Sequence, residues 1–349
     1  MTIMYESRRA RVAALLAERG VTALLVTRGV NVRYLTGLVS SNAAVLVRAD
    51  ASAVLATDSR YIETARRDCP GVEVVQERDV AGALALMADR PAIEAHDMSV
   101  ARYRRLGGDL PPVEGLVEAV RVVKDEPEIQ ALRTACELTD RAFADVVAAI
   151  APGMTERQVA RALEARMMEL GADKPAFDTI VASGPNGAVP HHSPGERPIE
   201  RGDLVTIDFG ALYGGYHADM TRTVAVGPVA GWQRELYDLV RAAQRAGRHA
   251  LAPGAAAAEV DAAAREVIDA AGHAAHFGHG LGHGVGLEIH EDPFLRPAGA
   301  GRLDDRVPIT VEPGVYLPGR GGVRIEDTLV TRAGGPELLT RTTKELLVL

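Results

Sequence analysis

The 349-residue chain contains an internal repeat, which restricts its fold more than any other feature of the sequence. Residues 151–153 (Ala-Pro-Gly) recur as residues 252–254, a spacing of 101 residues. Further identities occur at the same spacing: Val159 with Val260, Ala162 with Ala263, and Gly171 with Gly272. Each copy has the pattern of a turn followed by a helix that ends at glycine, and Thr155 with Gln158 predicts a capping box in the first copy. A strand–turn–strand segment with two acidic residues follows each copy, so we predict a duplicated unit whose two hairpins meet about a pseudo-two-fold axis.

The first acidic hairpin comprises residues 203–210, a turn near Tyr213 and Gly214, and residues 216–221. A turn centred between Tyr213 and Gly214 places Asp208 directly opposite Asp219, with Cβ atoms about 5 Å apart. Aspartate is disfavoured in strands, and two facing carboxylates repel each other. Either a cation lies between them or this face of the sheet is solvated.

The second acidic hairpin comprises residues 307–312 and 322–328. A turn centred near Gly319 places Glu312 opposite Glu326, and strand alternation puts Arg324 on the face of Glu326. Taken alone, this hairpin is better explained as a ladder of Arg and Glu side chains on an exposed surface.

The positions of the histidines along the chain favour a metal site. Nine of the ten histidines fall between His191 and His290. In residues 278–286 glycine alternates with other residues, so an extended segment would put His279 and His283 on one face and bare backbone on the other. Four carboxylates and one histidine form an oxygen-rich ligand set, which suits a pair of Mn²⁺, Co²⁺ or Zn²⁺ ions about 3.5–4 Å apart.

The first third of the chain reads as a small α/β domain. Short β-rich runs occur at residues 22–27, 44–48 and 53–57, and residues 31–37 between them are predicted to form a polar, aromatic loop. No catalytic cluster occurs before residue 120. The acidic and proline-containing segment 124–128 predicts the start of a long helix. We therefore place the domains at residues 1–123 and 124–349.

Composition excludes several classes of protein. The chain has 39 Lys and Arg against 47 Asp and Glu, a net charge of −8, which argues against nucleic-acid binding. No apolar run reaches the ~18 residues of a membrane helix, and the start of the chain lacks the pattern of a secretory signal. Two cysteines, Cys69 and Cys136, are too few for a disulfide framework. These observations predict a cytoplasmic protein that does not bind membranes.

Together the motifs resemble the metallopeptidases of the pita-bread fold, which include methionine aminopeptidase, aminopeptidase P and prolidase. The resemblance covers residues 125–349 as the catalytic domain. The first third resembles the creatinase-type N-terminal domain of the proline-specific members, including residues 31–37 and 58–61. It implies an α+β fold: a pita-bread catalytic domain with an internal pseudo-two-fold, preceded by a smaller α/β domain.

All five ligand positions of the resembled family are filled in this chain. The resemblance implies that Asp219 and Glu326 bridge two divalent metal ions, with Mn²⁺ expected first and Co²⁺ or Zn²⁺ as alternatives. Asp208 would complete one metal site, and His283 with Glu312 the other. Glu312 would also be the general base for the attacking water.

The same resemblance assigns residues on the substrate side. His191 and His290 would contact substrate and stabilise the tetrahedral intermediate, with His192 as an immediate neighbour that complicates the assignment. His279 matches a further substrate-side histidine. Arg324 matches a residue that lies near the metals.

The implied activity is hydrolysis of the bond between an N-terminal residue and a following proline, by an Xaa-Pro aminopeptidase. The alternative is an Xaa-Pro dipeptidase (prolidase), and a remoter one is a metal-free binding protein on the same fold. Methionine aminopeptidases usually lack such an N-terminal domain. A dipeptidase needs a cation for the substrate carboxylate. After residues 290–293 (His-Glu-Asp-Pro) stands Phe294, which offers ring packing but no charge and therefore favours the aminopeptidase; Arg296, two positions on, is the nearest cation that can reach back. The family also predicts a homodimer or larger assembly of this chain.

Overall fold

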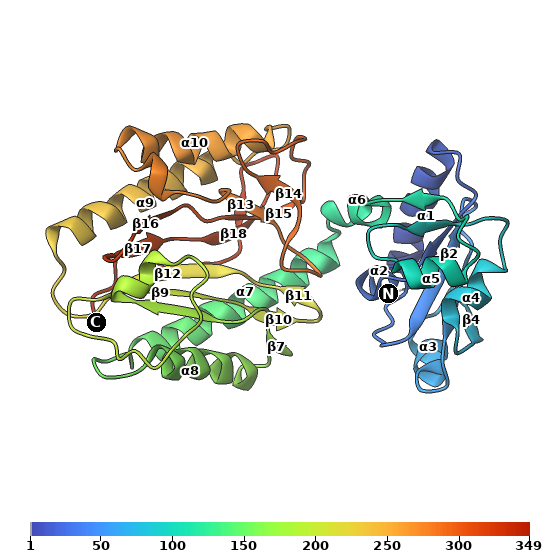
Figure 1. The fold of residues 1–349 in the computed structure, drawn as a ribbon, viewed down its shortest axis with the longest axis horizontal. Helices are drawn as coiled ribbons and strands as arrows, with labels where there is room; N and C mark the ends of the chain where they lie inside the picture. Colours follow the sequence, from blue (N-terminus) through green and yellow to red (C-terminus); the bar gives the residue numbers. More distant parts are fainter. Residues whose placement is uncertain (1) are drawn as a thin grey trace. The chain divides into compact units, whose positions relative to one another are not determined.

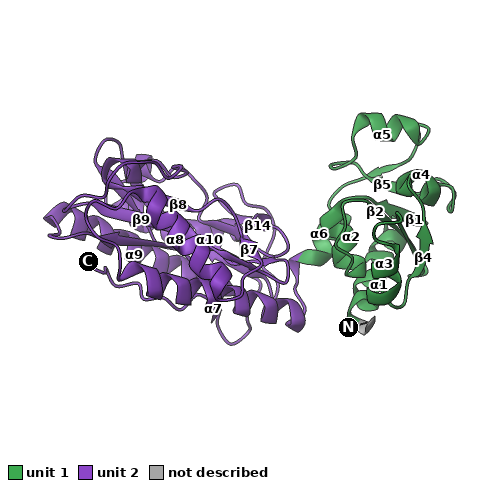
Figure 2. Cartoon of the chain, turned by 90° about the horizontal axis from the view of Figure 1, so that it is seen from below, with its two compact units in different colours: residues 1–121 green, residues 122–349 purple. Residues whose placement is uncertain are grey.

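The chain divides where short alternating elements give way to a long capped helix. The computed structural model describes residues 2–349 and separates two compact units, Met1–Arg121 and Val122–Leu349 (Figure 2). Helix α7, Glu126–Val147, follows soon after this division. Asp125 is its N-cap, because the Asp125 side chain accepts the backbone N–H of Glu128 at 2.9 Å. The Glu128 side chain accepts the backbone N–H of Asp125 in return, which completes a capping box.

The first unit is a six-stranded sheet with order β4-β3-β2-β1-β5-β6 and short helices between its strands. Its elements are α1 Thr2–Glu18, β1 Ala23–Val26, α2 Gly29–Thr36, β2 Ala43–Arg48, β3 Ala53–Thr57, α3 Ile62–Asp68, β4 Glu73–Gln76, α4 Val80–Ala85, β5 Ala92–Glu94, α5 Val100–Arg105, β6 Pro112–Val113 and α6 Leu116–Val122. Strands β1, β2 and β3 lie within one residue of the three predicted runs, so the α/β reading of this part is confirmed.

The predicted loop at residues 31–37 is wrong, because this segment forms most of helix α2. Gly37 ends the helix in the left-handed region, at φ 86°. The polarity that suggested a loop belongs to Asn31, which is fully buried and donates from its amide nitrogen to Glu94 at 2.6 Å and Glu118 at 2.7 Å. The side chain is therefore satisfied inside the unit rather than by water.

The second unit contains four long helices and thirteen strands. Its elements are α7, α8 Glu156–Glu169, β7 Lys174–Pro175, β8 Ile180–Ser183, η1 Gly184–Ala188, β9 Leu204–Phe209, β10 Ala211–Tyr213, β11 Tyr216–His217, β12 Met220–Ala225, α9 Gly231–Ala250, α10 Ala257–Ala270, η2 Ala274–His276, β13 Gly282–Gly284, β14 Glu291–Leu295, β15 Pro308–Val311, β16 Gly314–Leu317, β17 Gly321–Arg324, β18 Asp327–Val330 and β19 Glu337–Leu338.

The strands of this unit lie between two pairs of helices. Figure 1 shows α7 and α8 along one side of the strands and α9 with α10 along the other. The strands form sheets of order β12-β9-β8, β14-β13-β15-β18-β19 and β11-β10-β7, together with the hairpin β16-β17. This mixture of helices and largely antiparallel strands confirms the predicted α+β class.

The sequence repeat corresponds to a repeat of structure. Helices α8 and α10 begin and end at the same 101-residue spacing as the matched tripeptides, and Thr155 and Gln158 form the predicted capping box. Each half also has its own apolar core: α7 and α8 pack with β8, β9 and β12, whereas α9 and α10 pack mainly with β13 to β18. The duplicated unit predicted from the sequence is therefore present.

Among residues 2–349, no helix is long and apolar enough to cross a bilayer. Cys69 and Cys136 are both buried and free.

Candidate active site

The first two acidic candidates lie on the β9–β12 hairpin, in a register two residues away from the predicted one. Asp208 pairs with Thr221 rather than with Asp219. The reason is the turn: Gly214 and Gly215 both have positive φ, 57° and 87°, and together form its centre. Strand alternation nevertheless keeps Asp219, two residues from Thr221, on the same face as Asp208.

The second hairpin has the predicted register. On the β15–β18 side Val311 pairs with Asp327, and the β16–β17 pairs continue the same register toward a turn at Gly319, which has φ 75°. Glu312 and Glu326 occupy the positions between these two sets of pairs. They therefore face each other where the hairpin passes from one sheet to the next.

The glycine-rich segment supplies the histidine. Its strand β13 lies between β14 and β15, and a Cβ atom at Gly282 would overlap the carbonyl oxygen of Thr310. Glycine thus permits the close approach of backbones that the alternating pattern predicted. Thr310 Oγ1 accepts the backbone N–H of His283 at 3.1 Å and donates to Glu312 at 3.3 Å, which links the two candidate ligands.

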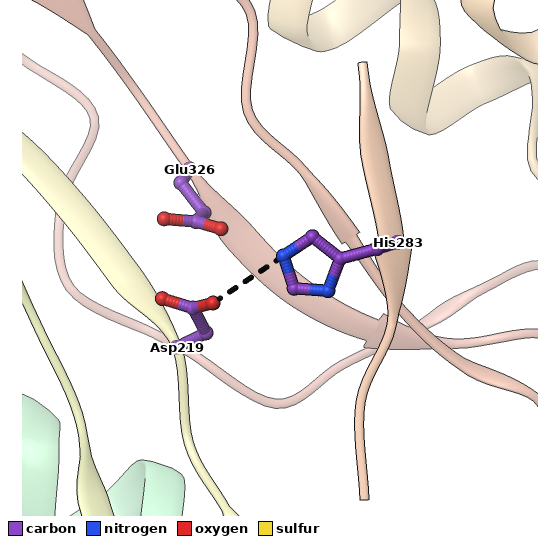
Figure 3. A group of neighbouring side chains, drawn as sticks. All are labelled: Asp219, His283 and Glu326. Atoms are coloured by element: carbon purple, nitrogen blue, oxygen red, sulfur yellow. Dashed lines mark ion pairs between the residues drawn. The ribbon is translucent and has the colours of Figure 1, made fainter. Parts of the chain in front are cut away.

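Three of the five candidate ligands form one buried group. One potential ligand atom from each of Asp219, His283 and Glu326 lies within 4.8 Å of the other two, and the three side chains point toward one another from three different strand segments (Figure 3). His283 Nε2 is 3.6 Å from Asp219 Oδ2 and 3.4 Å from Glu312 Oε1. Glu312 therefore belongs to the same cluster.

Arg324 connects the fifth candidate to this cluster. Its Nη2 donates to Asp208 Oδ2 at 2.6 Å, and its Nε donates to Thr221 Oγ1 at 3.0 Å. Thr221 in turn donates to Glu326 Oε2 at 2.7 Å. Arg324 is 3% exposed, so the hydrogen bonds run through a dry interior and hold the two hairpins together.

Burial makes the charged forms of these groups unfavourable. It raises the pKa values of Asp219 and Glu326 well above the ordinary range, and neighbouring carboxylates raise both further. The pKa of Glu312 rises to about 8, mainly through burial, with Arg324 opposing the rise. Burial lowers the pKa of His283 to about 4, which keeps its imidazole neutral and able to bind a metal.

The donor set fits divalent cations. Asp208 Oδ1 and Glu326 Oε1 are buried and have no hydrogen-bond partner among the described residues. Buried oxygens without partners are costly, and four carboxylates around one arginine carry excess negative charge. Divalent cations with oxygen and imidazole preferences would satisfy both deficits.

The predicted substrate-side histidines lie beside this cluster. The ring of His290 stands edge-on to that of His283, with centroids 4.4 Å apart, and His290 is exposed. Burial lowers the pKa of His279 to about 4 and also lowers that of His290, and the proximity of His191 lowers both further. His191 is exposed as well. His191 therefore lies near both His279 and His290, and His290 adjoins the candidate ligand His283.

Tyr316 belongs to the site but is absent from the residues inferred from the sequence. Its hydroxyl lies 2.9 Å from His279 Nε2 and accepts from Arg324 Nη1 at 3.0 Å. The residue is 8% exposed. A signal was available: Gly314 faces Arg324 across the β16–β17 hairpin, and Tyr316 follows Gly314 by two residues, on the same face.

Comparisons with known proteins support this arrangement of two parts. Residues 130–333 match the model of metallopeptidase family M24, and residues 8–123 match the creatinase/prolidase N-terminal domain. An Xaa-Pro dipeptidase of Pyrococcus furiosus is 46% identical over 235 residues, 67% of this chain and 68% of that protein.

Solved structures agree over nearly the whole chain. The Xaa-Pro dipeptidase of Bacillus anthracis has a TM-score of 0.95 at 36% identity and covers 99% of this chain and 100% of its own. The X-Pro aminopeptidase of Thermotoga maritima has a TM-score of 0.89 at 36% identity, with coverages of 98% and 99%. With a creatinase-type N-terminal domain and a pita-bread catalytic domain, the chain belongs to metallopeptidase family M24.

Proposed function

We propose that this hydrolase is an Xaa-Pro dipeptidase that uses two divalent metal ions, with Mn²⁺ as the expected pair. The observation that carries the proposal is the buried group of Asp219, His283 and Glu326 with Glu312 beside it. The sequence predicts this dipeptidase activity as the alternative to an aminopeptidase. The named relatives support it better than the aminopeptidase, because most of them are Xaa-Pro dipeptidases or prolidases.

When bound, the ions would polarise the carbonyl group of the substrate and lower the pKa of a bound water. In this assignment Asp208, Asp219, His283, Glu312 and Glu326 hold them. Glu312 takes the proton from the attacking water, and the arginine that fixes Asp208 keeps the ligand strands in register. His191 and His290, both exposed beside the cluster, orient the substrate and donate to the developing oxyanion.

Arg296 supports the dipeptidase over the aminopeptidase. Phe294 pairs with His283 across the β13–β14 ladder, so the two side chains leave the same face of that ladder. Arg296 follows by two residues, and its guanidinium carbon lies 5.5 Å from the centre of the Phe294 ring. A cation placed there can bind the carboxylate of a C-terminal proline. The aminopeptidase stays a second candidate because Phe294 itself offers only packing.

The kcat/KM for an Xaa-Pro dipeptide, compared with that for the same peptide extended at its C-terminus, decides between them. We expect at least a tenfold preference for the dipeptide. Arg296→Met should abolish the preference, whereas Arg302→Met, a matched change at an exposed arginine bound to the Gly254 carbonyl, should leave it intact. Equal or faster cleavage of the extended peptide by the native chain would favour the aminopeptidase.

The cytoplasmic location and the assembly into a homodimer or larger oligomer remain predictions. Fractionation of the source cells and sedimentation velocity of the purified chain, respectively, test them.

A further inference from the structure

Outside the ligand cluster, one buried carboxylate has an unusual number of donors. Glu156 is the first residue of helix α8, and its side chain is 0% exposed. Oε1 accepts from the backbone N–H of Ser183 and the Ser183 hydroxyl, both at 2.8 Å, and from the Asn186 amide at 2.9 Å. Oε2 lies 2.8 Å from His192 Nε2 and accepts the backbone N–H of Gly195 at 3.1 Å.

These donors all belong to one segment, residues 183–195. Two of them are the backbone N–H groups of Ser183 and Gly195, at its two ends, so a single carboxylate closes the segment into a loop. The middle of the loop packs on β17: a Cβ atom at Gly187 would meet the backbone nitrogen of Gly322 at 3.2 Å. The loop is thus fixed between α8 and the strand that carries Arg324.

His191 stands between two of these anchors. Arg324 Nη1 donates to the carbonyl oxygen of Pro190 at 3.3 Å, and on the other side His192 is bound to Glu156. This arrangement separates the adjacent histidines. His192 is used to hold the loop, and His191 is left exposed beside His279.

We propose that Glu156 is a positioning residue for catalysis, which fixes the 183–195 loop so that His191 faces the substrate. The proposal deepens the proposed function and rests on the role assigned there to His191. Only a carboxylate suits the position. In either orientation of a glutamine side chain, its NH₂ group would point at a backbone N–H, that of Ser183 or that of Gly195.

The electrostatics agree with an ionised Glu156. Burial alone would raise its pKa, but the hydrogen bonds from Ser183, Asn186, His192 and Gly195 outweigh burial and lower it. The helix N-terminus favours the same negative charge.

Hydrogen exchange measured by mass spectrometry tests the loop without reference to activity. Glu156→Gln should raise exchange at least tenfold in residues 183–195 and leave bound metal unchanged, because the loop supplies none of the candidate ligands. Glu169→Gln is the matched control, since Glu169 lies at the exposed end of the same helix and contacts Arg166. Unchanged exchange in the loop, or an equal rise throughout the unit, would overturn the proposal.

A double-mutant cycle tests the link to His191. We expect Glu156→Gln to lower kcat/KM by about 10–100-fold, chiefly through kcat, as a displacement of about 1 Å does. In a His191→Ala background the same change should cost less than threefold, because there is no longer a histidine to position. Equal losses in both backgrounds would mean a general structural role and would overturn the proposal.

Two further outcomes separate this proposal from the proposed function. If His191→Ala alone retains full activity, the substrate role of His191 fails, and the positioning role falls with it, whatever the exchange data show. If Glu156→Gln does not fold, His192→Ala removes one anchor of the loop and should show the same dependence on His191. If the native chain loaded with metal does not cleave Xaa-Pro peptides, the proposed function is refuted instead.

Discussion

Replacing Asp219 by asparagine should have opposite effects on the metal-free and the metal-loaded protein. In the metal-free protein burial, and after it the neighbouring Asp208 and Glu312, raise the pKa of Asp219 well above its usual range, so an ionised Asp219 is costly there. Asparagine keeps the shape and removes the charge. With metal bound, the same substitution removes one of the residues to which the proposed function assigns metal binding.

The magnitudes follow from the geometry. Two carboxylate charges 4.8 Å apart, the outer limit for the Asp219 and Glu326 ligand atoms, repel by about 3.5 kcal/mol at an effective dielectric of about 20. Proton uptake by Asp219, whose pKa is raised, already removes part of this repulsion, so asparagine stabilises the metal-free protein by less than an ionised pair would imply. A metal present at about 100 times its Kd stabilises the native chain by about 2.7 kcal/mol, or about 5–11 °C in Tm for a unit of this size.

Calorimetry on chelator-treated protein, with and without added Mn²⁺, measures both effects, and mass spectrometry of the eluted metal measures occupancy. Native chain should gain Tm with Mn²⁺, whereas Asp219→Asn should start at an equal or higher Tm and gain little. Asp178→Asn makes the same chemical change at an exposed position and should behave as native. Full metal content in Asp219→Asn with a normal rise in Tm would refute the assignment of Asp219 as a ligand.

Three further predictions concern single residues. Glu312→Gln should lower kcat by at least 100-fold at normal expression, measured with saturating Mn²⁺, and a loss below about tenfold would place the base elsewhere. Lys124→Met breaks the buried ion pair with Glu291 at 2.8 Å and should lower stability by about 3–5 kcal/mol, whereas adding Glu291→Gln should recover part of it, as denaturant titrations would show. Burial lowers the pKa of His279 to about 4 in the folded chain. As the pH falls, His279 is therefore protonated in the unfolded chain before it is protonated in the folded chain. Stability should therefore decrease between about pH 6.5 and pH 4, and less steeply in His279→Phe.

The two acidic hairpins show how far the sequence could predict register. The second was predicted correctly because its turn has one symmetric centre, at Gly319, and the pairs on both sides obey it. In the first hairpin the observed register differs from the predicted one by two residues. The predicted turn is centred between Tyr213 and Gly214, whereas Gly214 and Gly215 together form the observed turn. Local turn chemistry therefore decides which carboxylates face each other.

The candidate ligands could be proposed from the sequence because each sits in a short pattern of its own, either acidic in or beside a strand or histidine among glycines. Glu156 had no such signal. It occupies an ordinary first-turn position for an acidic residue, and its partners lie 27 to 39 residues further along the chain. The prediction of a loop around Asn31 is wrong for the same reason, since the Asn31 side chain is bound by Glu94, which lies 63 residues away. Contacts of this kind depend on how elements pack, which no local pattern records.

The spread of the ligands along the chain has a consequence for synthesis. Asp208 and Asp219 leave the ribosome long before Glu326, and the strand that carries His283 pairs with β15, which follows it. Non-local strand pairs of this kind form late in folding. A nascent chain therefore presents only separate carboxylates, which hold divalent ions weakly, and the complete ligand set exists only after β18 has joined the sheet. Under the proposed assignment, a pair of ions would therefore be held by all five ligands only in the folded catalytic unit, and selection among ions would be a property of that folded unit.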